Sequence, residues 1–351
     1  MNLLLDILHP AHVHFFKGYV YKAREKGHNL TIVTRDKEIT NALLDRIGIP
    51  YQPLTVPARS MPGMVYELLF RWYKIYALLK RHRIQLAMSI SGLSTALPSR
   101  LRGIPNITFT DTEDARLSNR LSFPFSDAVA TPDFFLYDLG TKHVRYRGLH
   151  ELAYLRSFPS ADVTARCRAL GLPNAYVIIR LVAMDALHDI GVKGMSLSEL
   201  QALIAAAERL GRVYINSQAE LPPSLQAYRL PVPIEEIHIA LAGALLFIGE
   251  SPTMAVESSL LGTPAFLISP RWKKLGNMIH LERDFRLLRN FSSYDALIQT
   301  VREIRNPEKM KTEWRNRATR FCQSSVDMLE MIEALVEQTL QRKSRERGIN
   351  R

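Results

Sequence analysis

The sequence places one carboxylate, Glu257, about one turn inside an expected helix that follows a short apolar run. Small side chains surround it in the stretch GESPTMAVESSLLGTPAF, residues 249–266. A helix N-terminus carries partial positive charge and unused N–H groups, so it can hold phosphate oxygens. The hydroxyls of Ser251 and Thr253 can donate to the same oxygens, and Glu257 can accept both hydroxyls of a ribose. The alternative is that Glu257 only complements the helix dipole.

Arg180 is a second candidate for anion binding, because it directly follows the apolar run AYVII. Its planar guanidinium can grip a diphosphate through two parallel hydrogen bonds. The alternative is a structural salt bridge with an Asp of the next loop, which contains Asp185, His188 and Asp189. Ser217 ends the following apolar run in a similar way.

Three histidines, His9, His12 and His14, follow the first apolar run of the chain. Their spacing matches neither one helical face nor a common zinc pattern, so we expect no metal site. An imidazole with an unperturbed pKa of about 6.5 suits a general base, and His12 is favoured because it lies nearest the expected helix start. The alternative is that these rings satisfy backbone groups at that start.

Three carboxylates stand within four positions of the stretch TDTEDA: Asp111, Glu113 and Asp114. Crowding of like charges can raise one pKa and create an acid–base pair. The alternative is an ordinary solvated loop.

The elements that must position these groups are short apolar strands alternating with helices. This alternation is typical of a parallel sheet with helices on both faces, and it restarts near residue 175. In doubly wound domains, ligands bind at the carboxyl ends of the strands, where the candidate residues stand. The expected strands cover residues 2–8, 28–35, 49–56, 84–91, 104–111 and 127–134 in the first half, then 175–182, 212–218, 245–251 and 263–269.

The length of 351 residues suggests two domains at roughly 100–200 residues each. We expect a first Rossmann-like domain over residues 1–155 and a second over 172–310. A helical segment with a basic tail covers 311–351.

The composition limits the class of protein. The formal net charge of +12 favours an anionic partner, such as nucleic acid, acidic lipid or a phosphorylated substrate. The sequence has no aromatic RNA-binding motif or helix-turn-helix, so no nucleic-acid partner is expected, although a nucleic-acid-binding protein is the alternative from another class. The sequence has two distant cysteines, which indicates a reducing compartment. It has no pattern typical of a signal peptide and no apolar run of ~18 residues. We therefore expect a cytoplasmic protein.

The stretch 64–83, MVYELLFRWYKIYALLKRHR, predicts a helix whose part 70–83 is basic and aromatic. It favours peripheral contact with anionic lipid on the inner face of a membrane. The alternative is an ordinary sheet-covering helix with a solvated basic face.

Several of these motifs together resemble a family of proteins, the domain of unknown function 354, over roughly residues 1–310. The motifs are DILHPAHVHFFK, FTDTEDA, IIRLVAMDALHDIGVKG, LPPSLQAYRLPVP and GESPTMAVESSLLGTPAF. The wider kin of that family are the GT-B glycosyltransferases and the non-hydrolysing UDP-N-acetylglucosamine 2-epimerases. The resemblance implies a GT-B-like α/β fold, with two Rossmann-like doubly wound domains facing a central cleft. It also implies a nucleotide diphosphate sugar as substrate and no further cofactor.

In those relatives the second domain binds the nucleotide sugar through a small-residue loop and a helical Glu. Here Pro252-Thr253-Met254 replaces the usual Gly-Gly pair of that loop. The resemblance gives His12 the role of deprotonating an acceptor, and gives Asp111, Glu113 and His188 placements like those of epimerase acid–base groups. The expected nucleotide-sugar-binding residues are Arg180, Ser217, Ser251, Thr253, Met254 and Glu257.

Two functions follow as hypotheses. The first is a GT-B glycosyltransferase that moves a sugar, from UDP by preference, to a sugar or lipid-linked acceptor in cell-envelope glycan synthesis. The second is a sugar-nucleotide 2-epimerase, which needs no acceptor. The sequence lacks GxGxxG after its first strand and lacks GxxxxGK[ST], which disfavours dinucleotide and P-loop proteins.

Overall fold

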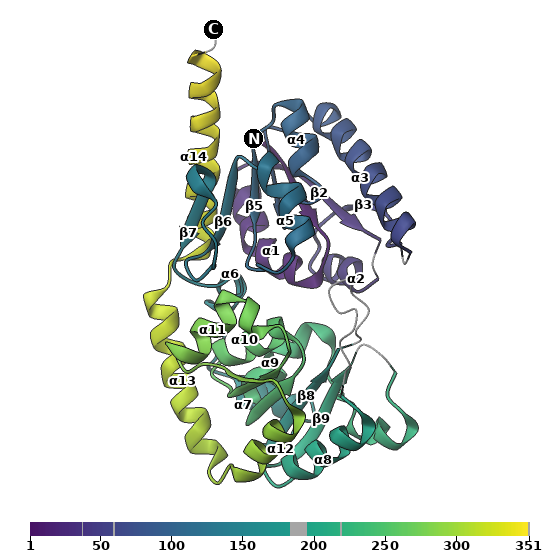
Figure 1. Ribbon diagram of the computed structural model, residues 1–351, viewed down its shortest axis with the longest axis vertical. Helices are drawn as coiled ribbons and strands as arrows, with labels where there is room; N and C mark the ends of the chain where they lie inside the picture. The colour runs from purple at the N-terminus through teal and green to yellow at the C-terminus, as the bar shows by residue number, and fades with distance from the viewer. Residues whose placement is uncertain (37, 59, 183–194, 218–219, 350–351) are drawn as a thin grey trace. The chain divides into compact units, whose positions relative to one another are not determined.

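The computed structural model describes residues 1–351 except 37, 59, 183–194, 218–219 and 350–351. The chain divides into two compact units (Figure 1). Unit 1 comprises residues 1–154 and 326–351, and unit 2 comprises residues 155–325. The C-terminal helical region is therefore shared, because α13 (Pro307–Ser324) belongs to unit 2 and α14 (Met328–Ile349) belongs to unit 1.

Unit 1 is built on a seven-stranded parallel sheet of order β3-β2-β1-β4-β5-β6-β7. Its first strand is apolar throughout, and Leu3, Leu4 and Leu5 are fully buried because helices cover both faces. The strands are β1 (Asn2–Ile7), β2 (Asn29–Arg35), β3 (Gln52–Thr55), β4 (Leu86–Ile90), β5 (Asn106–Phe109), β6 (Ala128–Pro132) and β7 (His143–Tyr146). The helices besides α14 are α1 (Pro10–Glu25), α2 (Glu38–Arg46), α3 (Met61–Arg81), α4 (Ala96–Arg102), α5 (Arg116–Ser122) and α6 (Leu152–Leu155), the last of which ends at the boundary of the units.

Unit 2 repeats this architecture with a five-stranded parallel sheet of order β12-β11-β10-β8-β9. The strands are β8 (Tyr176–Leu181), β9 (Arg212–Ser217), β10 (Leu246–Gly249), β11 (Ala265–Ile268) and β12 (Arg289–Phe291). The helices besides α13 are α7 (Val163–Ala169), α8 (Leu197–Ala207), α9 (Ile237–Gly243), α10 (Pro252–Leu260), α11 (Gly276–Arg283) and α12 (Tyr294–Glu303).

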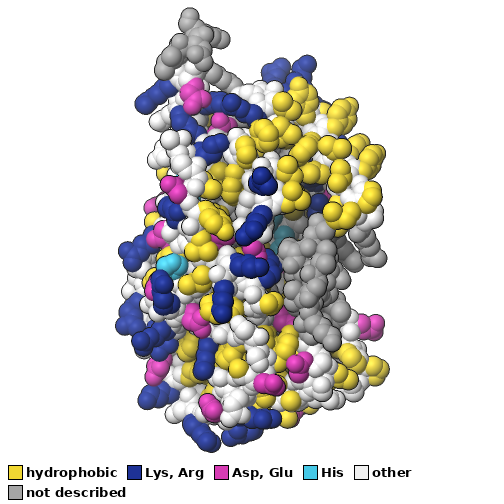
Figure 2. Space-filling model, in the orientation of Figure 1, with side chains coloured by type: hydrophobic (Ala, Val, Ile, Leu, Met, Phe, Trp, Pro, Cys, Tyr) yellow, Lys and Arg dark blue, Asp and Glu magenta, His cyan; other side chains and the backbone are white. Residues whose placement is uncertain are grey.

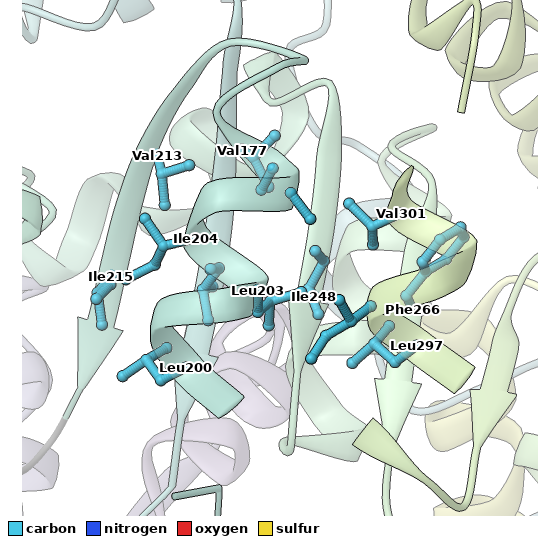
Figure 3. Close-up of a cluster of buried hydrophobic side chains, with 14 of the residues drawn as sticks. Val177, Leu200, Leu203, Ile204, Val213, Ile215, Ile248, Phe266, Leu297 and Val301 are labelled. Atoms are coloured by element: carbon cyan, nitrogen blue, oxygen red, sulfur yellow. The ribbon is translucent and has the colours of Figure 1, made fainter. Parts of the chain in front are cut away.

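The core of unit 2 forms where α8 and α12 pack on the sheet. Leu203 of α8 and Leu297 of α12 are fully buried in the same cluster as Ile248 of β10. Figure 3 shows the apolar side chains of both helices directed towards the strands they cover. A capping box, in which Ser196 and Glu199 bond each other's backbone N–H, fixes the start of α8.

The expected fold class is confirmed: both halves are α/β, with parallel sheets and flanking helices. Two edge strands were missed. β7 contains His143 and Arg145 and does not show an apolar run, and β12 is only three residues long. No helix in the described ranges is both long and apolar enough to cross a bilayer.

Candidate functional site

The carboxyl ends of β8, β9 and β10 meet at one edge of the unit 2 sheet, because the strands are parallel. In register, Arg180 of β8 lies opposite Gly249 of β10 on one side and Asn216 of β9 on the other. A Cβ at Gly249 would lie only 2.7 Å from the Cβ of Arg180. Glycine at this position therefore leaves the room that the Arg180 side chain occupies.

The Arg180 guanidinium has hydrogen-bonding capacity that the fold does not use. Its Nη1 donates to Oδ1 of Asn216. Its Nε is buried and has no hydrogen-bond partner among the described residues. Burial lowers the pKa of Arg180, while the carboxylates of Glu257 and Glu250 raise it in part. A half-buried guanidinium whose Nε–H is buried and unused is equipped to bind an anion.

The N-terminus of α10 belongs to the same group of elements, because α10 follows β10 directly. Ser251 is its N-cap, and the Ser251 Oγ accepts the Met254 N–H at 3.4 Å. Pro252 occupies the first helical position, where its fixed φ favours the helix. Ser251, Thr253 and Met254 are all half-buried, so the structure presents the expected residues at the start of a short helix.

Glu257 lies one turn further along α10 and is only 5% exposed. Its Oε1 lies 3.3 Å from Nε2 of His238, which is on α9. The structure therefore places a buried carboxylate and an imidazole side by side. His238 was not predicted from the sequence, since nothing in its own stretch relates it to a helix that starts after β10.

Glu250 is a second residue that was not predicted from the sequence, and it connects three segments of unit 2 by hydrogen bonds. Its Oε2 accepts the Val182 N–H at 3.1 Å, and its Oε1 accepts the Met195 N–H at 3.2 Å and the Tyr294 hydroxyl at 2.8 Å. Burial and this hydrogen bond raise the pKa of Tyr294. Its position directly after the apolar run of β10 is the sequence feature that could have identified it.

Ser217 ends β9 and pairs with Leu181, one residue beyond Arg180. It is half-buried. His188, the expected acid–base residue of this unit, lies outside the described residues.

In unit 1, His12 lies in the first turn of α1 and is half-buried. Its Nδ1 accepts the Leu8 N–H at 3.3 Å, which fixes the ring beside the end of β1. In the neutral ring the proton is then on Nε2. His9 is the N-cap of α1, and its ring accepts the Ala11 N–H at 3.2 Å.

Asp111 lies just after β5 and approaches a histidine that was not predicted from the sequence. Its Oδ2 is 3.6 Å from Nδ1 of the buried His150, and its Oδ1 accepts the Thr112 hydroxyl at 2.9 Å. Burial lowers the pKa of His150, against the opposing effect of Asp111. The His150 ring packs against Phe15 of α1, with ring centroids 4.8 Å apart.

Glu113 is 2% exposed, and its Oε1 accepts the Leu136 N–H at 3.2 Å. It thereby holds the loop that follows β6. Asp111 and Glu113 thus have different surroundings: Asp111 faces an imidazole, whereas Glu113 binds backbone.

A buried charge network occupies the corresponding edge of the unit 1 sheet. Arg71 of α3 forms an ion pair with Asp6 of β1, and both side chains are 1% exposed. This assigns Arg71 to the interior, although the sequence placed it on a basic surface helix. Arg71 also donates to the Thr34 carbonyl at 2.9 Å, to Thr55 Oγ1 at 3.2 Å and to Ser94 Oγ at 3.1 Å.

A pocket of about 880 Å³ lies elsewhere in unit 2, between α7, α9 and α13. Its wall includes Cys167, Tyr176 and Lys311, and it contains none of the candidate residues described above. Nothing in its chemistry connects it with the edge where Arg180 lies. Among the described residues, no cluster of three or more His, Cys, Asp or Glu is placed to hold a metal ion.

Comparison with solved structures supports the GT-B fold. MnaA of S. aureus, solved with UDP, has a TM-score of 0.68 and 9% identity, with 97% of each chain covered. The UDP-GlcNAc 2-epimerase of Neisseria meningitidis, bound to UDP-GlcNAc, has a TM-score of 0.65 and 9% identity, with 97% of this chain and 100% of that chain covered. The glycosyltransferase VinC, in complex with dTDP, has a TM-score of 0.61 and 12% identity, with 97% of this chain and 100% of that chain covered. The chain therefore has the α/β fold shared by GT-B glycosyltransferases and these epimerases.

The family resemblance is confirmed over the first part of the chain. Residues 1–163 match the model of a family described as "Protein of unknown function (DUF354)". No curated protein matches the chain.

Proposed function

We propose that the protein is a GT-B-type glycosyltransferase that uses a nucleotide diphosphate sugar, with UDP as the favoured carrier. One observation carries the proposal: the buried Nε of Arg180 has no partner among the described residues, at the sheet edge from which α10 begins. Burial lowers the pKa of Arg180, so an anion that pairs with it would relieve an unfavourable charge.

Each residue of the group has a role in this proposal. Arg180 and the N-terminus of α10 bind the diphosphate and stabilise the charge that develops on it as the sugar leaves. Ser251 and Thr253 donate hydroxyl hydrogen bonds to the diphosphate. The Met254 backbone N–H, which donates to Ser251 Oγ, holds the Ser251 hydroxyl in place. Glu257 binds the ribose, and His238 at 3.3 Å orients its carboxylate. His12 or Asp111 takes the proton of the acceptor hydroxyl.

The second candidate function is sugar-nucleotide epimerisation. Two carboxylate–imidazole pairs favour it, Asp111 with His150 and Glu257 with His238, since epimerisation needs acid and base groups. Incubation with UDP-N-acetylglucosamine alone separates the functions. A new sugar isomer identifies an epimerase, whereas turnover that begins only after an acceptor is added identifies a transferase.

The nucleotide site itself is tested by thermal unfolding with UDP. A ligand at ~100 times its dissociation constant stabilises the native state by about 2.7 kcal/mol, which corresponds to a rise of about 5–10 °C for a domain of this size. We expect this rise in the native chain, and its loss in Glu257→Gln because the ribose loses an ionised acceptor.

The matched control is Glu303→Gln on the exposed face of α12, which should keep the full rise. If Glu257→Gln responds to UDP like the native chain, the ribose assignment is wrong. If the native chain shows no rise with any nucleoside diphosphate, the proposed donor is wrong.

A further inference from the structure

Helix α3 buries two charged side chains on its inner face, in addition to the apolar Ile75, Leu78 and Leu79. Its acidic residue Glu67 is 5% exposed and its basic residue Arg71 is 1% exposed. Glu67 accepts hydrogen bonds from Arg35 Nε at 2.7 Å, the Thr55 hydroxyl at 3.0 Å and the Ala58 N–H at 3.1 Å. Arg71 is held by the buried network described above. These charged side chains and the apolar packing together fix the inner face of α3 to the sheet.

The outer face of α3 is apolar. Six large side chains recur there at helical spacing and are 39–69% exposed; we call them the α3 patch: Met61, Val65, Tyr66, Leu69, Phe70 and Tyr73. The rings of Tyr66 and Phe70 stack with centroids 6.0 Å apart. Figure 2 shows hydrophobic side chains gathered over α3 and α4. Contiguous apolar surface of this kind marks a protein or membrane contact.

The exposed charged side chains of residues 61–83 and of α4 have one sign. Residues 61–83 contain a single carboxylate, the buried Glu67, and α4 contains none. Lys80, Arg81 and Arg83 are exposed at the C-terminal end of α3. On the neighbouring α4, Arg102 stacks on Tyr76 of α3 at 3.6 Å, and Leu101 is 67% exposed. The partner that this surface fits is apolar in part and anionic at its margin.

We propose that α3 docks on the surface of an anionic lipid bilayer, with the α3 patch inserted at the boundary of headgroups and acyl chains. Tyrosine and phenylalanine suit that boundary, and nearby cations bind the anionic headgroups. A second copy of the chain fits less well. A two-fold contact sets a patch against itself, and α3 and α4 offer no exposed carboxylate to pair with the cations. This inference does not depend on the enzymatic activity.

The first test is sedimentation of the full chain with vesicles of phosphatidylglycerol and phosphatidylethanolamine. We expect the chain to bind these vesicles and to remain in solution with phosphatidylcholine vesicles. The triple variant Val65→Ser, Leu69→Ser, Tyr73→Ser should bind more than tenfold more weakly, because each side chain loses its apolar burial.

Its matched control is Leu117→Ser, Leu136→Ser, Tyr137→Ser, which removes two exposed aliphatic side chains and one exposed tyrosine elsewhere in unit 1. This control should bind within about twofold of the native chain. All six side chains are exposed, and circular dichroism with the urea midpoint verifies that both variants fold.

The second test addresses the cations. Lys80→Gln with Arg81→Gln should weaken binding to anionic vesicles by about fivefold per charge removed. Lys273→Gln with Lys274→Gln, the exposed control of equal charge in unit 2, should change it little. Binding of the native chain should fall as salt rises.

Three results would overturn the proposal. One is a native chain that stays in solution with anionic vesicles, and another is a patch variant that sediments as the native chain does. The third is a native dimer in solution that the patch variant converts to a monomer, because the occupant would then be a second copy.

Discussion

Arg71 of unit 1 is buried and Arg180 of unit 2 is half-buried, and the two units compensate these cations differently. In unit 1, Arg71 contacts the Asp6 carboxylate, a backbone carbonyl and two hydroxyls. In unit 2, Arg180 has only the Asn216 amide for its Nη1 and no partner for Nε among the described residues. Lys311, buried in α13, donates to the Gly243 carbonyl at 2.8 Å.

This difference distinguishes a charged group whose hydrogen bonds are all made within the fold from one that can still form hydrogen bonds to a ligand. A buried cation whose hydrogen bonds are filled by its own fold holds elements together, as Arg71 holds α3 to β1. A half-buried cation that has a buried, unpaired N–H can still bind a ligand that supplies the missing acceptor. At the carboxyl ends of its strands, unit 2 therefore has an arginine N–H that can bind a ligand. At the corresponding place in unit 1, the hydrogen bonds of Arg71 hold the fold together.

Breaking the unit 1 network should give the largest effect. Arg71→Ala leaves the Asp6 carboxylate buried and uncompensated, which should reduce the free energy of unfolding by about 3–5 kcal/mol. Urea unfolding at pH 7 measures it. The double variant Asp6→Leu, Arg71→Met removes both charges and should recover most of the loss. A loss below about 1 kcal/mol for Arg71→Ala would show that the pair is not structural.

The buried Lys311 of unit 2 should make the free energy of unfolding depend on pH. Burial, followed by Arg315, lowers the pKa of Lys311 from 10.5 to about 8. Between pH 8 and 10 the unfolded chain binds more protons at this position than the native chain, so stability at this site rises with pH. The rise is at most about 3 kcal/mol.

Lys311→Met should remove this rise in urea unfolding measured at pH 7, 8.5 and 10. An equal pH dependence in the variant and the native chain would mean that Lys311 keeps an ordinary pKa in the folded state.

Arg180→Gln should have a smaller and more selective effect. The variant should bind UDP about tenfold more weakly, because a charge-assisted contact to the diphosphate is lost, yet bind uridine as the native chain does. Titration calorimetry with both ligands measures the ratio. Arg305→Gln, at an exposed position of unit 2, is the control. An unchanged ratio of UDP to uridine affinity would remove Arg180 from the diphosphate site.

The sequence was sufficient for most of the fold because the buried strands are continuous apolar runs bounded by turn residues. It did not predict β7 or β12, because β7 contains His143 and Arg145 in place of an apolar run and β12 is only three residues long. It predicted a basic surface helix near residue 70, but Arg71 faces inward towards a partner 65 positions away in the chain. Local charge patterns do not show which side of a helix will be buried.

The candidate site was predictable to the extent that its residues directly follow apolar runs. Arg180 follows the apolar run AYVII within β8, whereas Ser251 and Glu257 follow β10, and they were named for that reason. His238 and Asn216 were missed, because α9 and the end of β9 approach these residues only through the sheet order. A single sequence gives the strands but not which side chains their order brings together.

The most direct test of the central claim is a crystal structure of the protein with UDP. We expect the diphosphate to contact Arg180 and the N-terminus of α10, and the ribose hydroxyls to bind the Glu257 carboxylate. A structure in which UDP binds elsewhere, while Arg180 and Glu257 contact only protein side chains, would contradict it.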